Sequence, residues 1–222
     1  MRVAPLLLSL ALTVTACGGS PAKHAAAALP SPSTTASASA PVDAAATAAL
    51  ARAEAVVRAT RSFAFVATEV FSGNASHTTS VHGSVVRGQG VTYVLVANGR
   101  TSQVVRLAGA TYVRSVPGHW SKLRKPRPVT DPASTLLAVL TGLTDPSVRA
   151  AGTAQVVSGS LPPAAAKAAQ LPSESAAAIT VTIDAAGHVT KVVVSTSSGG
   201  TGVTLTTSYA GFGEVPPLKP PV

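Results

Sequence analysis

Short alternating segments between Ser62 and Val116 constrain the fold of this chain most strongly. They are rich in Val, alternate apolar with polar residues, and end in Gly-containing turn signals. Asn98-Gly99 is the strongest of these signals because this dipeptide favours the two-residue turn of a β-hairpin. Alternation with a period of two places the side chains on opposite faces of a strand. Strands joined by short turns pair antiparallel, so the segment predicts a meander of at least five strands.

Helix signals flank this meander. Asp43 is a good N-cap for a helix over residues 44–60. Asp131-Pro132 predicts the start of a more apolar helix that runs to about Leu143. The predicted fold class is therefore α+β, with helices packed on a curved antiparallel β-sheet. The remaining predicted elements are a strand over 148–158, a short helix over 162–170, and strands over 179–183, 189–195 and 203–208.

The N-terminal end has the pattern of an exported lipoprotein. Residues 1–16 place a basic Arg2 before an apolar stretch that is too short to span a bilayer comfortably, which is typical of a secretory signal. Residues 14–18, VTACG, resemble a bacterial lipobox, in which the Cys is acylated and becomes the mature N-terminus. Cys17 is the only cysteine, which also excludes an internal disulfide. An ordinary signal peptide with an incidental Cys is the alternative.

The composition changes sharply after Cys17. Pro, Ser, Thr and Ala dominate up to Val42, which predicts a disordered tether. An acylated Cys17 would hold the protein at the cell membrane, on the extracytoplasmic face. The predicted parts are a signal peptide (1–16), the lipidated Cys and tether (17–42), a folded domain (43–212) and an extended Pro-rich tail (213–222).

Several short segments of the folded region point together to one group of proteins. They are Arg61-Ser62-Phe63-Ala64-Phe65, His82-Gly83-Ser84-Val85, Thr111-Tyr112-Val113-Arg114, Gly118-His119-Trp120, Asp131-Pro132, Val181-Thr182-Ile183-Asp184, Gly187-His188-Val189 and Phe212-Gly213. Their order, behind a lipobox and a tether, resembles the LppX/LprA/LprF/LprG group of actinobacterial lipoproteins, which share a fold with the LolA lipoprotein carriers. The resemblance implies a half-open barrel closed by helices around an apolar cavity that binds lipids or acylated glycolipids.

The composition is compatible with such a cavity. Hydrophobic residues make up 46% of the chain but aromatic residues only 4%, so few large side chains are present to fill a wide core. A closed core, in which the same side chains touch one another, is the alternative. Candidate ligand-binding residues come from alternate strand positions and the middle helix: Phe63, Phe65, Val85, Tyr93, Leu95, Leu107, Leu136, Leu140, Val181, Ile183 and Leu205.

The charge of the chain favours an anionic partner. The formal net charge is +9, and five cations form a candidate basic rim that would face anionic headgroups. A solvated loop in a basic protein is the alternative, and export argues against nucleic acid. The candidate rim consists of Arg114, Lys122, Arg124, Lys125 and Arg127.

Enzyme signals are missing from the sequence. It contains no Gly-x-Ser-x-Gly elbow, no P-loop and no complete dinucleotide-binding loop. The eight Asp and Glu residues are scattered, which does not favour a paired acid–base site, and the five His residues do not cluster with carboxylates. We therefore expect no catalytic activity, no metal and no cofactor.

The leading hypothesis is a membrane-anchored carrier that moves lipid or acylated glycolipid across the envelope. Its expected partners are the lipid, the membrane through Cys17, and an envelope transporter, and the protein is expected to be a monomer. A lipid-sensing or protein-docking lipoprotein without transport activity is the alternative.

Overall fold

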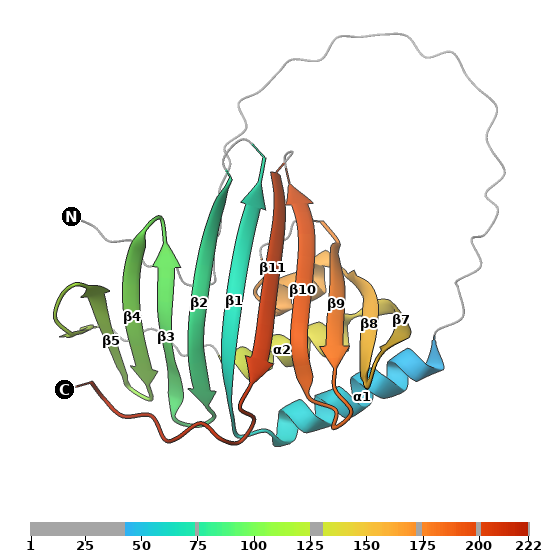
Figure 1. Cartoon of the computed structure of the whole chain (residues 1–222), viewed down its shortest axis with the longest axis horizontal. Coiled ribbons are helices and arrows are strands. Elements are labelled where there is room, and N and C mark those ends of the chain that lie inside the picture. The colour runs from blue at the N-terminus through green and yellow to red at the C-terminus, as the bar shows by residue number, and fades with distance from the viewer. Residues whose placement is uncertain (1–42, 74–75, 125–130, 172–174, 199–200, 222) are drawn as a thin grey trace, which may run out of the picture.

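The computed structural model describes residues 43–73, 76–124, 131–171, 175–198 and 201–221. Within these residues, all strands form one antiparallel sheet that carries three helices, so the predicted α+β class is confirmed (Figure 1). The helices are α1 (Ala44–Ala59), α2 (Pro132–Gly142) and α3 (Pro163–Ala168). The strands are β1 (Ser62–Ser72), β2 (His77–Val86), β3 (Gly90–Ala97), β4 (Arg100–Leu107), β5 (Ala110–Val116), β6 (Ser121–Lys122), β7 (Thr144–Ala151), β8 (Ala154–Leu161), β9 (Ala177–Ile183), β10 (Val189–Ser198) and β11 (Thr201–Ala210).

The predicted meander is present as β1 to β5, with the short β6 added at its edge. A two-residue turn joins β3 and β4 at the predicted Asn98-Gly99, where φ is 50° and 69°. Two successive positive φ angles are typical of the hairpin turn whose twist matches that of its strands. The local turn chemistry therefore fixes the order of this half of the sheet.

The two halves of the sheet meet at its centre. The strand order is β6-β5-β4-β3-β2-β1-β11-β10-β9-β8-β7, so the first long strand lies beside the last. Phe65 pairs with Tyr209 across this junction, and Glu69 pairs with Leu205. Among the described strands, the edge strands β6 and β7 do not pair with each other, so the sheet stays open.

One predicted strand is wrong. The segment 148–158 is a hairpin of β7 and β8, in which Val148 pairs with Val157. The chain reverses at Gly152, whose φ of 62° is in the left-handed region that favours glycine. A lone Gly between Ala151 and Thr153 is a weak turn signal, which explains the error. Pro146 also lies inside β7 rather than before it, at a register irregularity in an edge strand where proline is tolerated.

Both long helices begin at the predicted aspartates. The Asp43 side chain accepts hydrogen bonds from the backbone N–H groups of Ala45 (2.9 Å) and Ala46 (3.1 Å). Asp43 also accepts one from the N–H of Val148 in β7 (3.0 Å), which ties the start of α1 to the sheet edge. Asp131 caps α2 through the N–H of Ala133 (3.0 Å).

The sheet has two distinct faces. We call the face that carries Phe63, Val85 and Val181 the helix face, because these residues belong to the same buried cluster as Leu50 of α1 and Leu136 of α2. The opposite, outer face carries the exposed Val66 and Val70 of β1.

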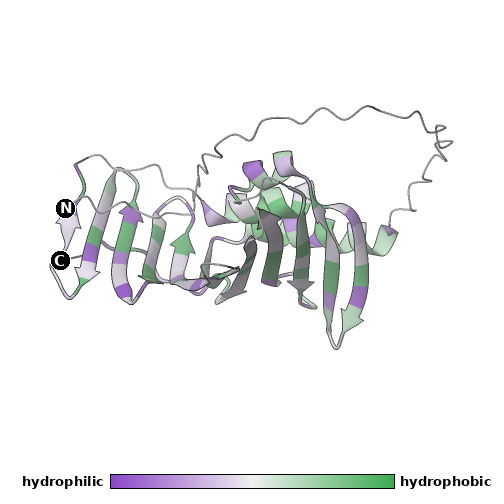
Figure 2. Ribbon diagram, turned by 90° about the horizontal axis from the view of Figure 1, so that it is seen from above, coloured by the Kyte–Doolittle hydropathy of each residue, from purple (hydrophilic) through white to green (hydrophobic). Residues whose placement is uncertain are grey.

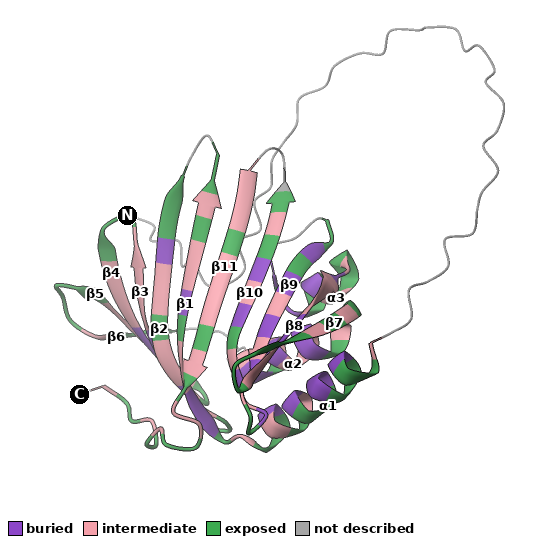
Figure 3. Ribbon diagram, turned by 45° about the vertical axis from the view of Figure 1, so that its right-hand side comes forward, coloured by how far each residue is buried: buried purple, intermediate pink, exposed green. Residues whose placement is uncertain are grey.

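The helices cover only part of the helix face. They gather over the half built by β7 to β11, where α1 contacts β7 and β8, and Figure 2 shows no helix against β3 to β5. Figure 3 shows the corresponding concentration of buried residues on β9 and β10 and on the inner sides of the helices. The two halves of the sheet therefore differ in what covers them.

Candidate functional site

The predicted ligand-binding residues come together on the helix face, with one exception. Leu107 lies on the outer face, because the alternation of β4 gives the inward positions to Val104 and Arg106. Phe63, Val85, Tyr93, Leu136, Leu140, Val181 and Ile183 lie inside the buried apolar cluster, and Phe65, Leu95 and Leu205 pack against it. The arrangement is one buried apolar cluster that runs from one half of the sheet to the other, and we call the inward side chains of the strands in this cluster the apolar surface.

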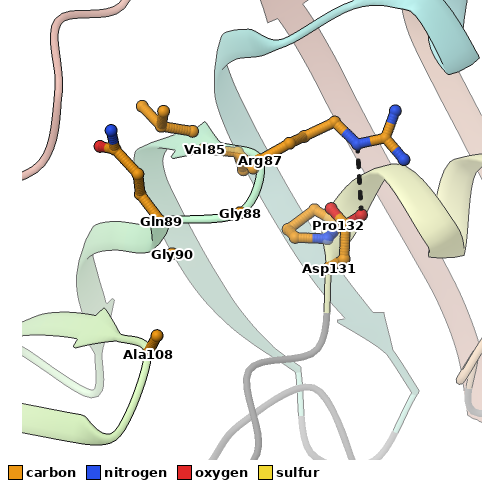
Figure 4. A pocket seen from close by; sticks show the side chains of 9 residues that line it. Val85, Arg87, Gly88, Gln89, Gly90, Ala108, Asp131 and Pro132 are labelled. Atoms are coloured by element: carbon orange, nitrogen blue, oxygen red, sulfur yellow. Dashed lines mark ion pairs between the residues drawn. The ribbon is translucent and has the colours of Figure 1, made fainter.

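A pocket opens at one end of this surface, between the β2–β3 turn and the start of α2 (Figure 4). Its volume is about 230 Å³. Apolar atoms dominate its lining, but Arg87, Gln89 and Asp131 bring polar groups to it. Val85 is the predicted ligand-binding residue that lines this pocket.

Arg87 joins three elements beside the pocket. Its guanidinium Nε lies 3.6 Å from Oδ2 of Asp131 at the start of α2, and Figure 4 marks this ion pair. Its Nη1 donates to the carbonyl oxygens of Arg58 (2.8 Å) and Val57 (3.5 Å) at the end of α1. Both charged side chains are one-third exposed. We call these contacts the Arg87 clasp.

The C-terminal tail lies against the same turn. The backbone N–H of Leu218 donates to Oε1 of Gln89 at 2.9 Å. The N–H of Gly213 donates to the carbonyl of Ser62 at 2.8 Å, which fixes the start of the tail at β1. The tail therefore runs along one end of the sheet from β1 towards the β2–β3 turn (Figure 1).

The sequence prediction missed buried polar residues on the helix face, among them Arg106 and Thr111. Arg106 is 6% exposed and Thr111 only 2%, and they are direct partners across β4 and β5. Neither Nε of Arg106 nor the Thr111 hydroxyl has a hydrogen-bond partner. The signal was present in the alternation of β4, because Arg106 follows Val104 at the next inward position.

Two further titratable groups face the same side of the sheet near the β1–β11 junction. Burial raises the pKa of the Glu69 carboxyl, and the nearby His77 partly opposes this shift. Burial also raises the pKa of the Tyr209 hydroxyl. The Tyr209 ring meets Phe63 edge-on, with 5.7 Å between ring centroids.

The candidate basic rim is only partly described, since Lys125 and Arg127 lie outside the described residues. Arg114 donates from Nε to Oε1 of Gln103 (3.0 Å), and its guanidinium lies 4.9 Å from the ring centroid of Trp120. Lys122 lies 6.0 Å from the ring centroid of Tyr112. Arg124 is exposed. Lipid contact by the rim stays a prediction.

The remaining predictions concern the N-terminal region, membrane-spanning helices and metal binding. Cys17, the signal peptide and the tether also lie outside the described residues. In the part of the chain that the structure describes, no helix has the length and apolar character needed to cross a membrane. No group of three His, Cys, Asp or Glu side chains there is arranged to hold a metal ion.

The architecture defines a class of fold: an open antiparallel sheet with helices over part of one face and an apolar surface beneath them. Solved structures of two mycobacterial proteins share it. The Mycobacterium tuberculosis lipoprotein LppX is 15% identical, with 78% of this chain and 97% of that chain covered at a TM-score of 0.50. LprF from Mycobacterium bovis is 16% identical, with 81% of this chain and 98% of that chain covered at a TM-score of 0.51.

The chain therefore has the LppX/LprF fold, and the predicted resemblance is confirmed at the level of fold. A comparison of the sequence with protein-family profiles and with curated proteins finds no match.

Proposed function

We propose that the protein is a membrane-anchored lipoprotein that binds lipid or acylated glycolipid on the helix face of its sheet and carries it across the envelope. The observation that carries this proposal is the apolar surface of the helix face. The fold shared with LppX, itself a lipoprotein, and the lipobox at Cys17 support it.

The proposal has a simple energetic basis. A lipid that leaves a bilayer exposes its hydrocarbon to water at a cost of about 0.8 kcal/mol per methylene. A carrier lowers this cost by offering apolar side chains in place of the bilayer. The cluster residues of β1 to β3, such as Phe63, Val85 and Tyr93, have the required chemistry.

Uptake of a whole lipid requires the structure to open. The pocket of about 230 Å³ is smaller than the ~300–1,000 Å³ of typical ligand pockets. The start of α2 forms one wall of it, at Asp131 and Pro132. Displacement of α2 from the β2–β3 turn would join the pocket to the apolar surface, and the partly exposed Arg87–Asp131 ion pair is the contact that must break.

Native mass spectrometry tests binding directly. The full chain carrying Cys17→Ala, purified without detergent from a bacterial host, is expected to retain lipid or to take up dioleoylphosphatidylglycerol from vesicles. Replacement of Val85 by Asp should abolish uptake, because a charge would then line the pocket. The matched variant Val66→Asp, on the exposed outer face, should bind normally. A folded protein that takes up no lipid under any condition would refute the proposal.

A transfer assay separates a carrier from a lipid sensor. Donor vesicles contain a self-quenched fluorescent phospholipid and acceptor vesicles contain none. A carrier speeds the appearance of fluorescence in proportion to protein concentration. Binding without faster transfer would favour the sensing alternative.

The anchor is tested by membrane fractionation. Wild-type protein is expected in the membrane fraction and Cys17→Ala in the soluble fraction, because Cys17 is the acylation site of the predicted lipobox. Cys17→Ser serves as a second variant with a similar side-chain volume. Continued membrane anchoring of both variants would contradict the lipobox prediction.

A further inference from the structure

The buried pair of Arg106 and Thr111 is unexplained by an apolar lipid surface. Neither residue takes part in the three ion pairs of the described residues. Nε of Arg106 and the hydroxyl of Thr111 are both buried without a hydrogen-bond partner. Buried polar groups in folded proteins are normally hydrogen-bonded, and an unpaired buried charge is unfavourable. Two such groups side by side could donate hydrogen bonds to one bound polar group.

The position of the pair connects it to the pocket. A row of directly paired residues crosses the helix face from β1 to β5: Phe63, Val85, Val91, Arg106 and Thr111. Val85 lines the pocket, and the pair lies two strands further along the same row. Arg106 and Thr111 are also next to the ends of β4 and β5, so they lie at the same end of the sheet as the β2–β3 turn.

The chemistry of the pair selects an anion. A guanidinium is a planar donor that matches the oxygens of a phosphate or carboxylate, and a threonine hydroxyl can donate to the same group. The Arg106 guanidinium also lies 5.8 Å from the ring centroid of Tyr93, and its Nε has no hydrogen-bond partner. Val91 and Val104 surround this polar pair with apolar side chains.

The surroundings favour an anion that carries hydrocarbon. A free phosphate would lose hydration here without gaining any apolar contact, whereas a lipid headgroup would enter together with acyl chains that bind the adjoining surface. We propose that Arg106 and Thr111 form a subsite for the phosphate or carboxylate of an anionic lipid headgroup. This inference rests on the proposed lipid-binding function and adds the class of lipid.

The test compares two lipids with identical acyl chains. Dioleoylphosphatidylglycerol carries an anionic phosphate and dioleoylglycerol does not. Titrations followed by native mass spectrometry use the full chain carrying Cys17→Ala, with Arg106→Gln, Arg106→Met, Arg106→Lys or Thr111→Val added. The matched control is Arg149→Gln, which removes one positive charge from an exposed position in β7. Circular dichroism verifies that each variant is folded.

We expect phosphatidylglycerol to bind more tightly than dioleoylglycerol to the parent protein. Arg106→Gln and Arg106→Met should weaken phosphatidylglycerol binding about ten- to hundredfold and leave dioleoylglycerol binding unchanged, because a charge-assisted hydrogen bond is lost. Arg106→Lys should keep part of the preference for phosphatidylglycerol. Thr111→Val should weaken phosphatidylglycerol binding less than Arg106→Gln does. Arg149→Gln should bind both lipids normally. Unchanged phosphatidylglycerol binding in folded Arg106→Gln and Arg106→Met would overturn the inference while leaving lipid binding intact.

Inorganic phosphate separates the remaining outcomes through its effect on the melting temperature. In one outcome no lipid binds, and phosphate raises the melting temperature of the parent and of Arg149→Gln but not that of Arg106→Gln. The proposed lipid-binding function then fails, and the anion subsite stands. If phosphate has no Arg106-dependent effect in that case, both fail. If phosphate binds as tightly as phosphatidylglycerol, the site serves a free anion and the assignment to a lipid headgroup is overturned.

Discussion

At the scale of single residues, the helix face is defined by a few exceptions to its apolar character. Most inward positions hold Val, Leu, Ile or an aromatic residue, whereas Arg106, Thr111 and Glu69 introduce polar groups. Such groups reduce the stability of the ligand-free protein because they lose hydration on folding. This loss of stability can be measured in the protein without ligand.

Arg106→Met is therefore expected to stabilise the ligand-free protein. Methionine keeps the apolar length of the side chain and removes the unpaired charge, for a gain of about 1 kcal/mol or more in the free energy of unfolding. Urea denaturation of delipidated protein measures this change in the free energy of unfolding. The control Arg149→Met, on the exposed surface, should stay within about 0.5 kcal/mol of wild type. A clear loss of stability in Arg106→Met would mean that the guanidinium makes a net favourable contact with Tyr93.

Glu69→Gln should stabilise the protein at neutral pH and not in acid. Burial raises the pKa of Glu69 in the folded state above its ordinary 4.5, so the charged form destabilises the fold at pH values above that range. Wild type should therefore gain stability relative to Glu69→Gln as the pH falls through the folded pKa. The two melting temperatures should converge below about pH 4.5. The gain is small because the carboxyl is only half-buried, and melting curves from pH 4 to 8 measure it.

The exposed Glu214 supplies the control for this experiment. Glu214→Gln should leave the melting temperature close to that of wild type across the same pH range. A Glu69→Gln variant that is less stable than wild type at pH 7 would contradict the burial argument.

At the scale of elements, the Arg87 clasp decides how α1 and α2 are held near the pocket. One side chain contacts the last carbonyls of α1 and the N-cap of α2. The helices otherwise lie over the other half of the sheet, and this clasp links both of them to the β2–β3 turn.

Arg87→Ala is expected to lower the free energy of unfolding by about 1 kcal/mol and to speed lipid uptake. Stability is lost because the Arg87 guanidinium no longer donates to the carbonyl of Arg58. The loss is small because the ion pair with Asp131 is partly exposed. Arg58→Ala, which breaks the exposed helix pair with Glu54, is the control and should cost about 0.5 kcal/mol or less. Stopped-flow uptake of a fluorescent lipid measures the rate. Slower uptake in Arg87→Ala would contradict the proposed displacement of α2.

At the scale of the whole molecule, the two halves of the sheet differ in burial. With the exception of Thr111, the most completely buried large side chains belong to β8, β9 and the start of β10. Helices cover that half, whereas β3 to β5 have none against them in Figure 2. One half thus has the packing of a stable scaffold, and the other presents the surface proposed to bind lipid.

Hydrogen exchange should resolve this difference. Amides of β9 are expected to exchange slowest, because they lie in the helix-covered half and between two paired strands. Amides of β4 and β5 should exchange faster in the ligand-free protein and slow on addition of dioleoylphosphatidylglycerol. Equal protection of both halves without lipid would contradict the assignment of scaffold and binding surface.

The sequence alone determined the local elements of this protein. Alternating residues and Asn98-Gly99 determined the meander, and Asp43 and Asp131 determined where two helices begin, because these signals act between neighbouring residues. The hairpin at Gly152 was missed because a single glycine is a weak signal.

The tertiary structure decided which local elements meet. The pairing of β1 with β11 joins residues far apart in the chain, so no local pattern specifies it. Only that arrangement shows which inward positions are covered by helices. It also turns Arg106 from one charge in an alternating strand into a buried side chain whose Nε has no hydrogen-bond partner. Burial depends on what the rest of the chain places nearby, and this is the physical reason that the candidate site needed the fold as well as the sequence.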